Sequence, residues 1–215
     1  MTDKFEYRPL ASHINWLGFK IAKSNQNWHQ PNLELGAFLV IQSVHALHET
    51  IDLPAQSLRF SWEQNDKYFQ KNDHALLAPL ACLPIYLITI GDERDEELVY
   101  VGKTTSKSSR FVAGHTAITK LHAPCFEGKT KRLYRCCVVL ISDQKREIPI
   151  EWITPYDEGV ALLSAIENSL IYNFRPPLNV QLVNRRPSVE IGSIHIQNIT
   201  DETDFLNDYF VDPPA

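Results

Sequence analysis

The carboxylate of Glu167 is the most informative single side chain in the sequence. It falls on the apolar stripe of an expected helix. The stripe consists of Val160, Leu163, Leu170, Ile171 and Phe174. A carboxylate among apolar side chains costs several kcal/mol unless it is paired or bound to a metal. Two interpretations follow, a buried salt bridge or a metal ligand directed into a cleft.

Two tyrosines and two cations accompany this glutamate in the sequence. Tyr86 and Tyr100 fall in neighbouring apolar segments, and a glycine and Lys103 follow Tyr100. Arg110 comes seven residues after that lysine. A lone tyrosine in a strand usually serves as a half-buried packing residue. Together, however, these groups suit a phosphodiester, because cations and a metal neutralise developing charge and a phenolate can take a proton from water.

The elements that must position these residues begin after Pro84. Residues 85–90 are rich in β-branched and aromatic residues and predict a strand. An acidic, glycine-led loop follows, and residues 98–101 predict the returning strand of a hairpin that ends at Gly102. Further along, the pattern predicts a helix over 110–122, a central strand over 134–141 and a short strand over 148–153.

A helix is predicted to begin at Asp157, with Glu158 in its first turn. Arg175-Pro176-Pro177 ends it, because proline cannot continue a helix and restricts the residue before it. Residues 189–196 predict a last strand, and we expect the acidic tail beyond it to be mobile.

Residues 1–80 are expected to be mainly helical. Asn32 could cap a helix whose apolar positions approximate a helical stripe. These positions are Leu33, Leu35, Phe38, Leu39, Ile41, Val44 and Leu47. This region would supply target contacts or a dimer interface, or serve as a scaffold that completes the core.

Several short motifs occur in a fixed order along the chain. They are Pro84-Ile85-Tyr86, Tyr100-Val101-Gly102-Lys103, Arg110, Glu167 and Arg175-Pro176-Pro177-Leu178-Asn179. In residue type and order they resemble the GIY-YIG nuclease family, over nearly half of the chain. The resemblance implies an α+β fold with a small central mixed or antiparallel sheet flanked by helices, spanning 81–186. A mainly helical extension (1–80) would precede this core, and a C-terminal strand and acidic tail (187–215) would follow it.

The resemblance also implies roles for the residues that would carry the reaction. Tyr86 would be the general base or would position the attacking water, and Tyr100 would share its hydrogen-bond network. Lys103 would lower the pKa of a phenol, which is ordinarily near 10. Arg110 would hold the scissile phosphate and stabilise the transition state.

Two further roles concern the metal and the frame of the site. Glu167 would ligate one Mg²⁺ or Mn²⁺, and no small-molecule cofactor is implied. Asn179 would hold the site together by bonding to backbone. Family enzymes leave a 5′-phosphate and a 3′-hydroxyl, so these are the expected products.

The sequence departs from the family pattern in two places. Pro84 stands at the family's first glycine, which a strand start tolerates. The family often places a histidine or tyrosine four residues after the arginine, but Gly114 occupies that position and His115 is the next residue. On an ideal helix this spacing turns His115 roughly 140° away from Arg110. Either His115 is still used or Lys103 carries its role, and we favour His115.

The charge distribution favours a nucleic-acid partner despite a net charge of −5. Residues 103–135 contain eight lysines and arginines against the single acid Glu127, a local charge of +7. Binding responds to the local field more than to the total charge. The expected DNA contacts are Lys107, Lys120, Lys129, Lys131 and Arg132. The alternative is a solvated face.

Composition places the chain among ordinary globular proteins, with 44% hydrophobic and 22% charged residues. No apolar run approaches the length of a membrane span, and the first residues lack the layout of a secretory signal. We therefore expect a cytoplasmic protein. The four cysteines lack metal-site spacing and are expected to be reduced packing residues.

The leading functional hypothesis is a stand-alone DNA endonuclease of restriction or defence type, acting on duplex DNA. A homodimer would provide the two active sites needed to cut both strands symmetrically. The main alternative is a non-catalytic nucleic-acid-binding module that keeps the nuclease fold. A third hypothesis, a protein-interaction domain, leaves the basic segment 103–135 unexplained.

Overall fold

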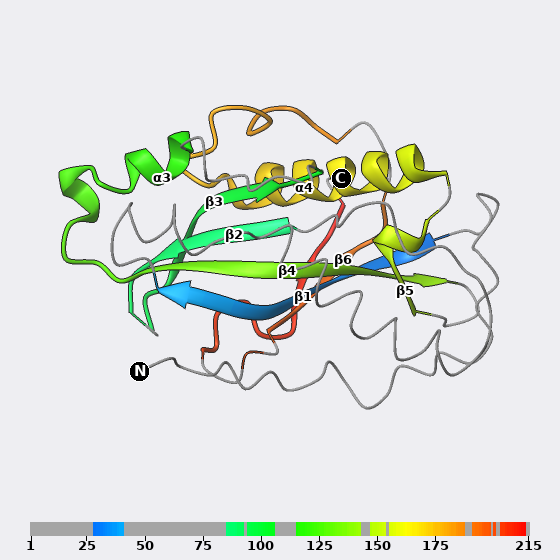
Figure 1. The fold of residues 1–215 in the computed structure, drawn as a ribbon, viewed down its shortest axis with the longest axis horizontal. Coiled ribbons are helices and arrows are strands. Elements are labelled where there is room, and N and C mark those ends of the chain that lie inside the picture. The colour runs from blue at the N-terminus through cyan, green and yellow to red at the C-terminus, as the bar shows by residue number, and fades with distance from the viewer. Residues whose placement is uncertain are drawn as a thin grey trace.

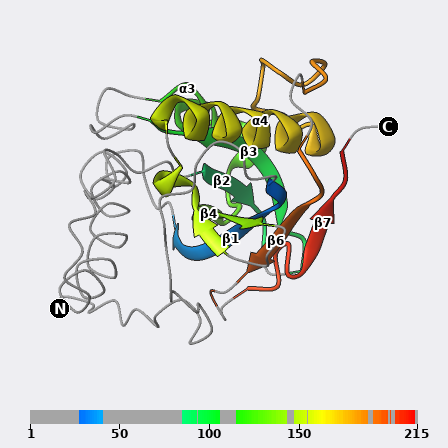
Figure 2. The same ribbon diagram turned by 90° about the vertical axis from the view of Figure 1, so that its right-hand side faces the viewer.

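The computed structural model describes residues 28–40, 85–92, 94–105, 115–142, 147–153, 155–187, 191–198, 200 and 203–213. These residues form a mixed α/β fold around one curled sheet (Figures 1 and 2). Among the described residues, no helix has both the length and the apolar content that crossing a membrane would require.

The sheet contains strands from every part of the chain. Its strands are β1 (Trp28–Val40), β2 (Ile85–Ile90), β3 (Glu97–Lys103), β4 (Lys131–Ser142), β5 (Glu147–Pro149), β6 (Ile194–Asn198) and β7 (Tyr209–Val211). Their order is β3-β2-β4-β1-β6-β7, and β5 pairs with β4. The β1–β6 pair is parallel and the others are antiparallel. The three expected parts of the chain, residues 1–80, 81–186 and 187–215, therefore each contribute at least one strand to the same sheet.

A helix was predicted to begin at Asn32, but residues 32–40, the described part of that segment, belong to strand β1. Leu33 and Leu35 are fully buried, whereas Glu34 between them is only partly buried. Asn32 is buried as well, so the strand is identified by its pairing and not by an alternation in burial. Pairing with β4 on one side and β6 on the other overrides the approximate helical stripe. The rest of the predicted helical region, residues 1–27 and 41–80, lies outside the described residues.

The predicted hairpin and central strand are confirmed. Strands β2 and β3 pair directly, with Tyr86 opposite Gly102 and Ile88 opposite Tyr100. Strand β4 lies between β2 and β1 and supplies the centre of the sheet. The short strand predicted over 148–153 is observed as β5 followed by the 3₁₀ turn Ile150–Trp152 (η2).

Helix α4 (Tyr156–Phe174) confirms the helix predicted from Asp157. It ends at Arg175, whose left-handed backbone (φ 47°) stops the helix before Pro176. Its apolar face, including Leu163, Ile166 and Leu170, packs with Leu87 and other buried residues of the sheet. Figure 1 shows α4 lying along the sheet beside β3.

The other face of the β2–β3 hairpin is covered by α3 (Thr116–Lys120). Ala117 and Ile118 of this helix pack with Ile88 and Leu133 of the sheet. The short 3₁₀ turn η1 (Pro124–Phe126) leads from α3 towards β4. The hairpin is therefore enclosed between two helices, one on each face.

The C-terminal segment returns to the core as a strand. The tail was expected to be mobile, but residues 209–211 form β7 and pair with β6. Val211 is buried in the main core, and the ring of Tyr209 lies 5.7 Å from that of Phe174 at the end of α4. Residues 209–211 thus form a paired strand, contrary to the expectation of a mobile tail.

Candidate functional site

Three aromatic side chains meet on the α3 side of the hairpin. Tyr86 Oη lies 2.9 Å from His115 Nε2, within hydrogen-bond distance. The Tyr100 ring centroid lies 6.0 Å from that of Tyr86 and 5.2 Å from that of His115, edge-on to the imidazole. Tyr86 is fully buried. We call these three residues the tyrosine–histidine group.

Gly102 makes room for the tyrosine–histidine group. A Cβ atom on Gly102 would lie 2.4 Å from Tyr86 Cζ, 2.5 Å from Tyr86 Oη and 2.8 Å from Tyr100 Cε1. Any side chain here would therefore displace both phenols. The absence of a side chain at Gly102 thus admits the two tyrosine rings.

His115 reaches Tyr86 because it precedes α3. Its backbone is extended (φ −135°, ψ 122°), and the helix starts at Thr116. Of the helix predicted over 110–122, the described residues show only Thr116–Lys120 as helical. Residues 110–114 lie outside the described residues. The rotation of roughly 140° expected between Arg110 and His115 holds only within a continuous helix. His115 lies before the helix, so that rotation does not apply to it.

A second polar group lies on the α4 side of β3. Lys103 Nζ lies 3.2 Å from Glu167 Oε2, and it also donates to Ser164 Oγ at 2.5 Å. The side chains of Lys103 and Glu167 are 24% and 15% exposed. We call Lys103, Ser164 and Glu167 the lysine–glutamate group. Glu167 is thus ion-paired, as the salt-bridge interpretation expected, and its side chain is partly exposed.

The two groups lie on opposite faces of β3. Successive residues of a strand point to opposite sides, so Gly102 faces the tyrosines and Lys103 faces α4. The sequence suggested one convergence of phenols, cations and glutamate. The structure instead places the two groups back to back, joined by two consecutive residues of the strand.

Asn179 fixes β3 from its outer edge. Its Oδ1 accepts from Val101 N, and its Nδ2 donates to Val101 O, each at 2.9 Å. Leu178 N donates to Val99 O nearby at 3.0 Å. The side chain of Asn179 therefore acts like a neighbouring strand. This is the backbone contact that the family resemblance implied.

The basic residues of segment 103–135 occupy different positions. Lys129 is exposed, and Lys120 is partly exposed at the end of α3. Lys131 Nζ donates to two backbone carbonyls, those of Phe126 and Lys129. Arg110 and Lys107 lie outside the described residues.

Arg132 corrects one expectation from the charge pattern. It is only 8% exposed, and its guanidinium donates to Gly91 O at 3.0 Å and pairs with Glu96 Oε2 at 3.4 Å. A buried, paired arginine stabilises the β2–β3 loop against β4 and does not present its charge to DNA. It is therefore removed from the set of expected DNA contacts.

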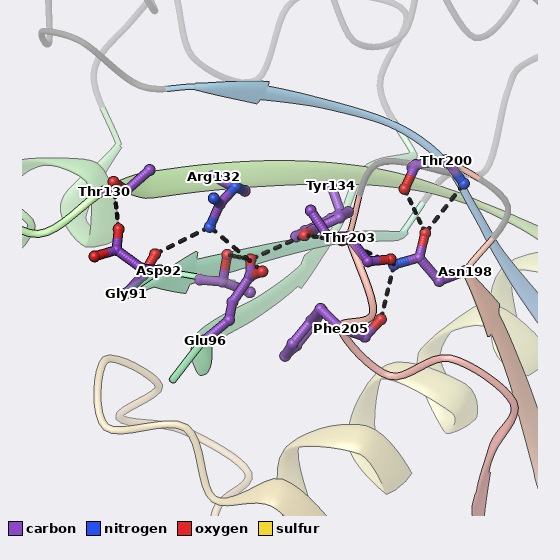
Figure 3. A network of polar contacts seen from close by, with 11 residues as sticks. Gly91, Asp92, Glu96, Thr130, Arg132, Tyr134, Asn198, Thr200, Thr203 and Phe205 are labelled. Carbon is purple, nitrogen blue, oxygen red and sulfur yellow. Dashed lines mark hydrogen bonds and ion pairs between the residues drawn. The ribbon is translucent and has the colours of Figure 1, made fainter. Parts of the chain in front are cut away.

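Figure 3 shows the polar network to which this pair belongs. Tyr134 Oη donates to Glu96 Oε1 at 2.9 Å and lies 2.8 Å from Thr203 Oγ1. Asn198 Nδ2 in turn donates to the carbonyls of Thr203 and Phe205, each at 2.9 Å. Burial, the largest cause, raises the pKa of the Tyr134 phenol above its ordinary value. The network holds the C-terminal segment on the core, and no local pattern in the sequence predicted it.

Glu167 is the described residue to which the family resemblance assigns a divalent metal. No cluster of three or more His, Cys, Asp or Glu side chains suited to a metal ion occurs within the described ranges. Mg²⁺ is commonly held by one or two carboxylates, with waters and substrate phosphates completing its shell. A partly exposed carboxylate fits an ion completed in this way. It does not fit a structural zinc site, which uses four protein ligands.

No protein-family model, curated protein or solved structure matches this chain.

Proposed function

We propose that this chain is a divalent-metal-dependent endonuclease of the GIY-YIG type. It would hydrolyse phosphodiester bonds of duplex DNA and leave 5′-phosphate and 3′-hydroxyl ends. The observation that carries the proposal is the contact between Tyr86 Oη and His115 Nε2 next to Gly102, with the following residue, Lys103, paired to Glu167 on the opposite face of β3. These residue types stand in the order of the family's motifs.

The tyrosine–histidine group would activate the attacking water. A phenol is a weak base when neutral, but a neighbouring imidazole can take its proton. Tyr86 would accept a proton from water as its own passes to His115 Nε2. The ring of Tyr100 packs edge-on against the imidazole and would hold it in this orientation.

The lysine–glutamate group would stabilise negative charge on the phosphate. A divalent ion held by Glu167 would neutralise the developing charge and assist departure of the leaving oxygen. Lys103 would contribute a second positive charge, and Arg110 would hold the scissile phosphate as the resemblance implies. The phosphate would then lie across the end of β3, where Gly102 and Lys103 adjoin.

The wider setting belongs to the same proposal. Lys120 and Lys129 would contact the DNA backbone beside the site, together with Lys107 and Lys131. A homodimer would allow both strands to be cut, as in a cytoplasmic restriction or defence enzyme.

One observation favours a second candidate, a DNA-binding module without catalysis. Tyr86 is fully buried, whereas a general base must reach a water molecule. The two candidates differ in one outcome, because the module binds DNA but does not cut it.

The test uses supercoiled plasmid and phage DNA, each with Mg²⁺ or with EDTA. We expect Mg²⁺-dependent cutting that is lost in Glu167→Ala. Tyr86→Phe keeps the ring but removes the hydroxyl, and it should lower the cleavage rate by about 100- to 10,000-fold. Tyr134→Phe removes an equally buried hydroxyl outside the site, so it should keep its cleavage rate when folded.

The pattern of products decides among the hypotheses. Discrete fragments would support a restriction-type enzyme, whereas nicking or smearing would support a nuclease of another role. Salt-sensitive binding without cutting of duplex, branched or RNA substrates would favour the binding module. Equal loss of activity in Tyr86→Phe and Tyr134→Phe would remove the assigned role of Tyr86.

A further inference from the structure

The ammonium of Lys103 is held by two side chains of the same helix. Ser164 and Glu167 are three residues apart on α4, so they lie on one face of the helix. Lys103 contacts the oxygen of each, Ser164 Oγ at 2.5 Å and Glu167 Oε2 at 3.2 Å. One of these partners is a charged carboxylate and the other is a neutral hydroxyl.

The hydroxyl of Ser164 is oriented to receive a cation. It donates its only proton to the Val160 carbonyl, at 2.7 Å. A serine hydroxyl has one proton and two lone pairs. Because the proton is used within the helix, the lone pairs are left to accept from Lys103 Nζ. The backbone of α4 therefore fixes Ser164 as an acceptor.

We propose that Ser164 is a positioning residue for Lys103, and that it retains the ammonium when Glu167 takes up a divalent metal. This inference rests on the proposed function. Lys103 and a metal ion compete for the same carboxylate, since each cation is stabilised by its negative charge and repels the other. Ser164 gives the ammonium an anchor that the metal does not need.

Removing this anchor should affect the metal and the reaction together. In Ser164→Ala, Lys103 depends on Glu167 alone, so a metal ion must displace its only described side-chain partner. We expect metal affinity and kcat each to fall roughly tenfold, with KM for DNA unchanged. Ser164→Thr retains a hydroxyl that can bond the carbonyl one turn earlier, and it should restore both.

The first measurement is Mn²⁺ binding to the full-length, DNA-free protein, followed by loss of the free-ion EPR signal. Glu167→Ala defines the background. Ser169→Ala is the matched control, because Ser169 lies on the same helix and its buried Oγ has no hydrogen-bond partner among the described residues. Thermal unfolding of each variant in EDTA confirms that it is folded.

The outcomes separate this inference from the proposed function. Weaker Mn²⁺ binding in Ser164→Ala, restored in Ser164→Thr and unchanged in Ser169→Ala, supports the role of Ser164. Binding in Ser164→Ala equal to that of the unaltered protein overturns it while leaving the metal site in place. No difference between the unaltered protein and Glu167→Ala overturns the metal site and the inference with it. A kcat that falls equally in Ser164→Ala and Ser164→Thr would also overturn it.

Discussion

Gly102 and Lys103 are consecutive residues of β3, and each positions a different half of the candidate site. The missing side chain of Gly102 leaves space for the phenols of Tyr86 and Tyr100. The long side chain of Lys103 reaches α4 and pairs with Glu167. The backbone of two residues therefore links the tyrosine–histidine group on one face of the strand to the lysine–glutamate group on the other.

Gly102→Ala tests this close approach. The added methyl group would overlap the fully buried ring of Tyr86, so the structure must shift locally, and we expect a loss of about 1–3 kcal/mol in unfolding free energy. The contact between Tyr86 and His115 should break, and cleavage should be abolished. Urea unfolding and plasmid cleavage measure the two effects.

Gly128→Ala is the control for this change. No atom of the described residues lies within 4 Å of a Cβ placed there, although its φ of +73° makes alanine strained. It should cost roughly 1 kcal/mol and leave cleavage intact. Normal activity in Gly102→Ala would show that the observed ring positions are not needed.

At the level of elements, β3 is the edge strand of the sheet within the described ranges, and the side chain of Asn179 bonds to its outer edge. Asn179 follows α4 closely, and its amide satisfies both the N–H and the C=O of Val101. The abrupt end of the helix at Arg175 and Pro176 brings the amide to this edge. Helix termination and the geometry of the site are thus connected through one short segment.

Asn179→Ala would leave both backbone groups of Val101 without this partner. We expect a loss of about 1–3 kcal/mol in unfolding free energy and slower cleavage, because β3 carries residues of both groups. Asn184→Ala, at an exposed asparagine of the same segment, should change neither. If the two variants unfold at the same urea concentration, the contact with Val101 does not contribute to stability.

For the whole molecule, the C-terminal segment closes the core through a buried polar network. Glu96 from the β2–β3 loop, Tyr134 from β4 and Thr203 after β6 meet in one chain of hydrogen bonds. Such a network stabilises a fold only while every member keeps its partner. It also makes stability depend on the protonation of Tyr134.

The raised pKa of Tyr134 predicts loss of stability in alkali. Burial favours the neutral phenol in the folded state, and the ordinary pKa is 10.0. Its contribution is therefore fully present below pH 10.0 and is lost as pH rises towards the higher folded-state pKa. Above that onset the unfolding free energy should fall by about 1.4 kcal/mol per pH unit from this group alone.

Urea unfolding at a series of alkaline pH values measures this loss, and Tyr134→Phe is the control. Burial also raises the pKa of the Cys136 thiol, which adds to the alkaline decline in both proteins. The variant is expected to be less stable at neutral pH but to show a shallower decline above pH 10.0. Identical slopes would mean that the phenol ionises as easily in the folded protein as in the unfolded chain.

The sequence by itself determined those elements whose signals are local. Three features were predicted from neighbouring residues alone. They are the β-branched and aromatic residues of β2, the glycine-led turn before β3 and the prolines that end α4. The chemical character of Tyr86, Lys103 and Glu167 could likewise be judged from their types and their places in these patterns.

Only the tertiary structure decided how these residues and elements combine. Segment 32–40 forms a strand because β4 and β6, which are distant in sequence, pair with it. Arg132 of β4 is held in an ion pair because Glu96 of the β2–β3 loop lies next to it. The same is true of Ser164, whose role depends on Lys103, 61 residues earlier in the chain. Local patterns fix backbone preference and side-chain type, whereas the partner that a polar group meets depends on packing between segments far apart in sequence.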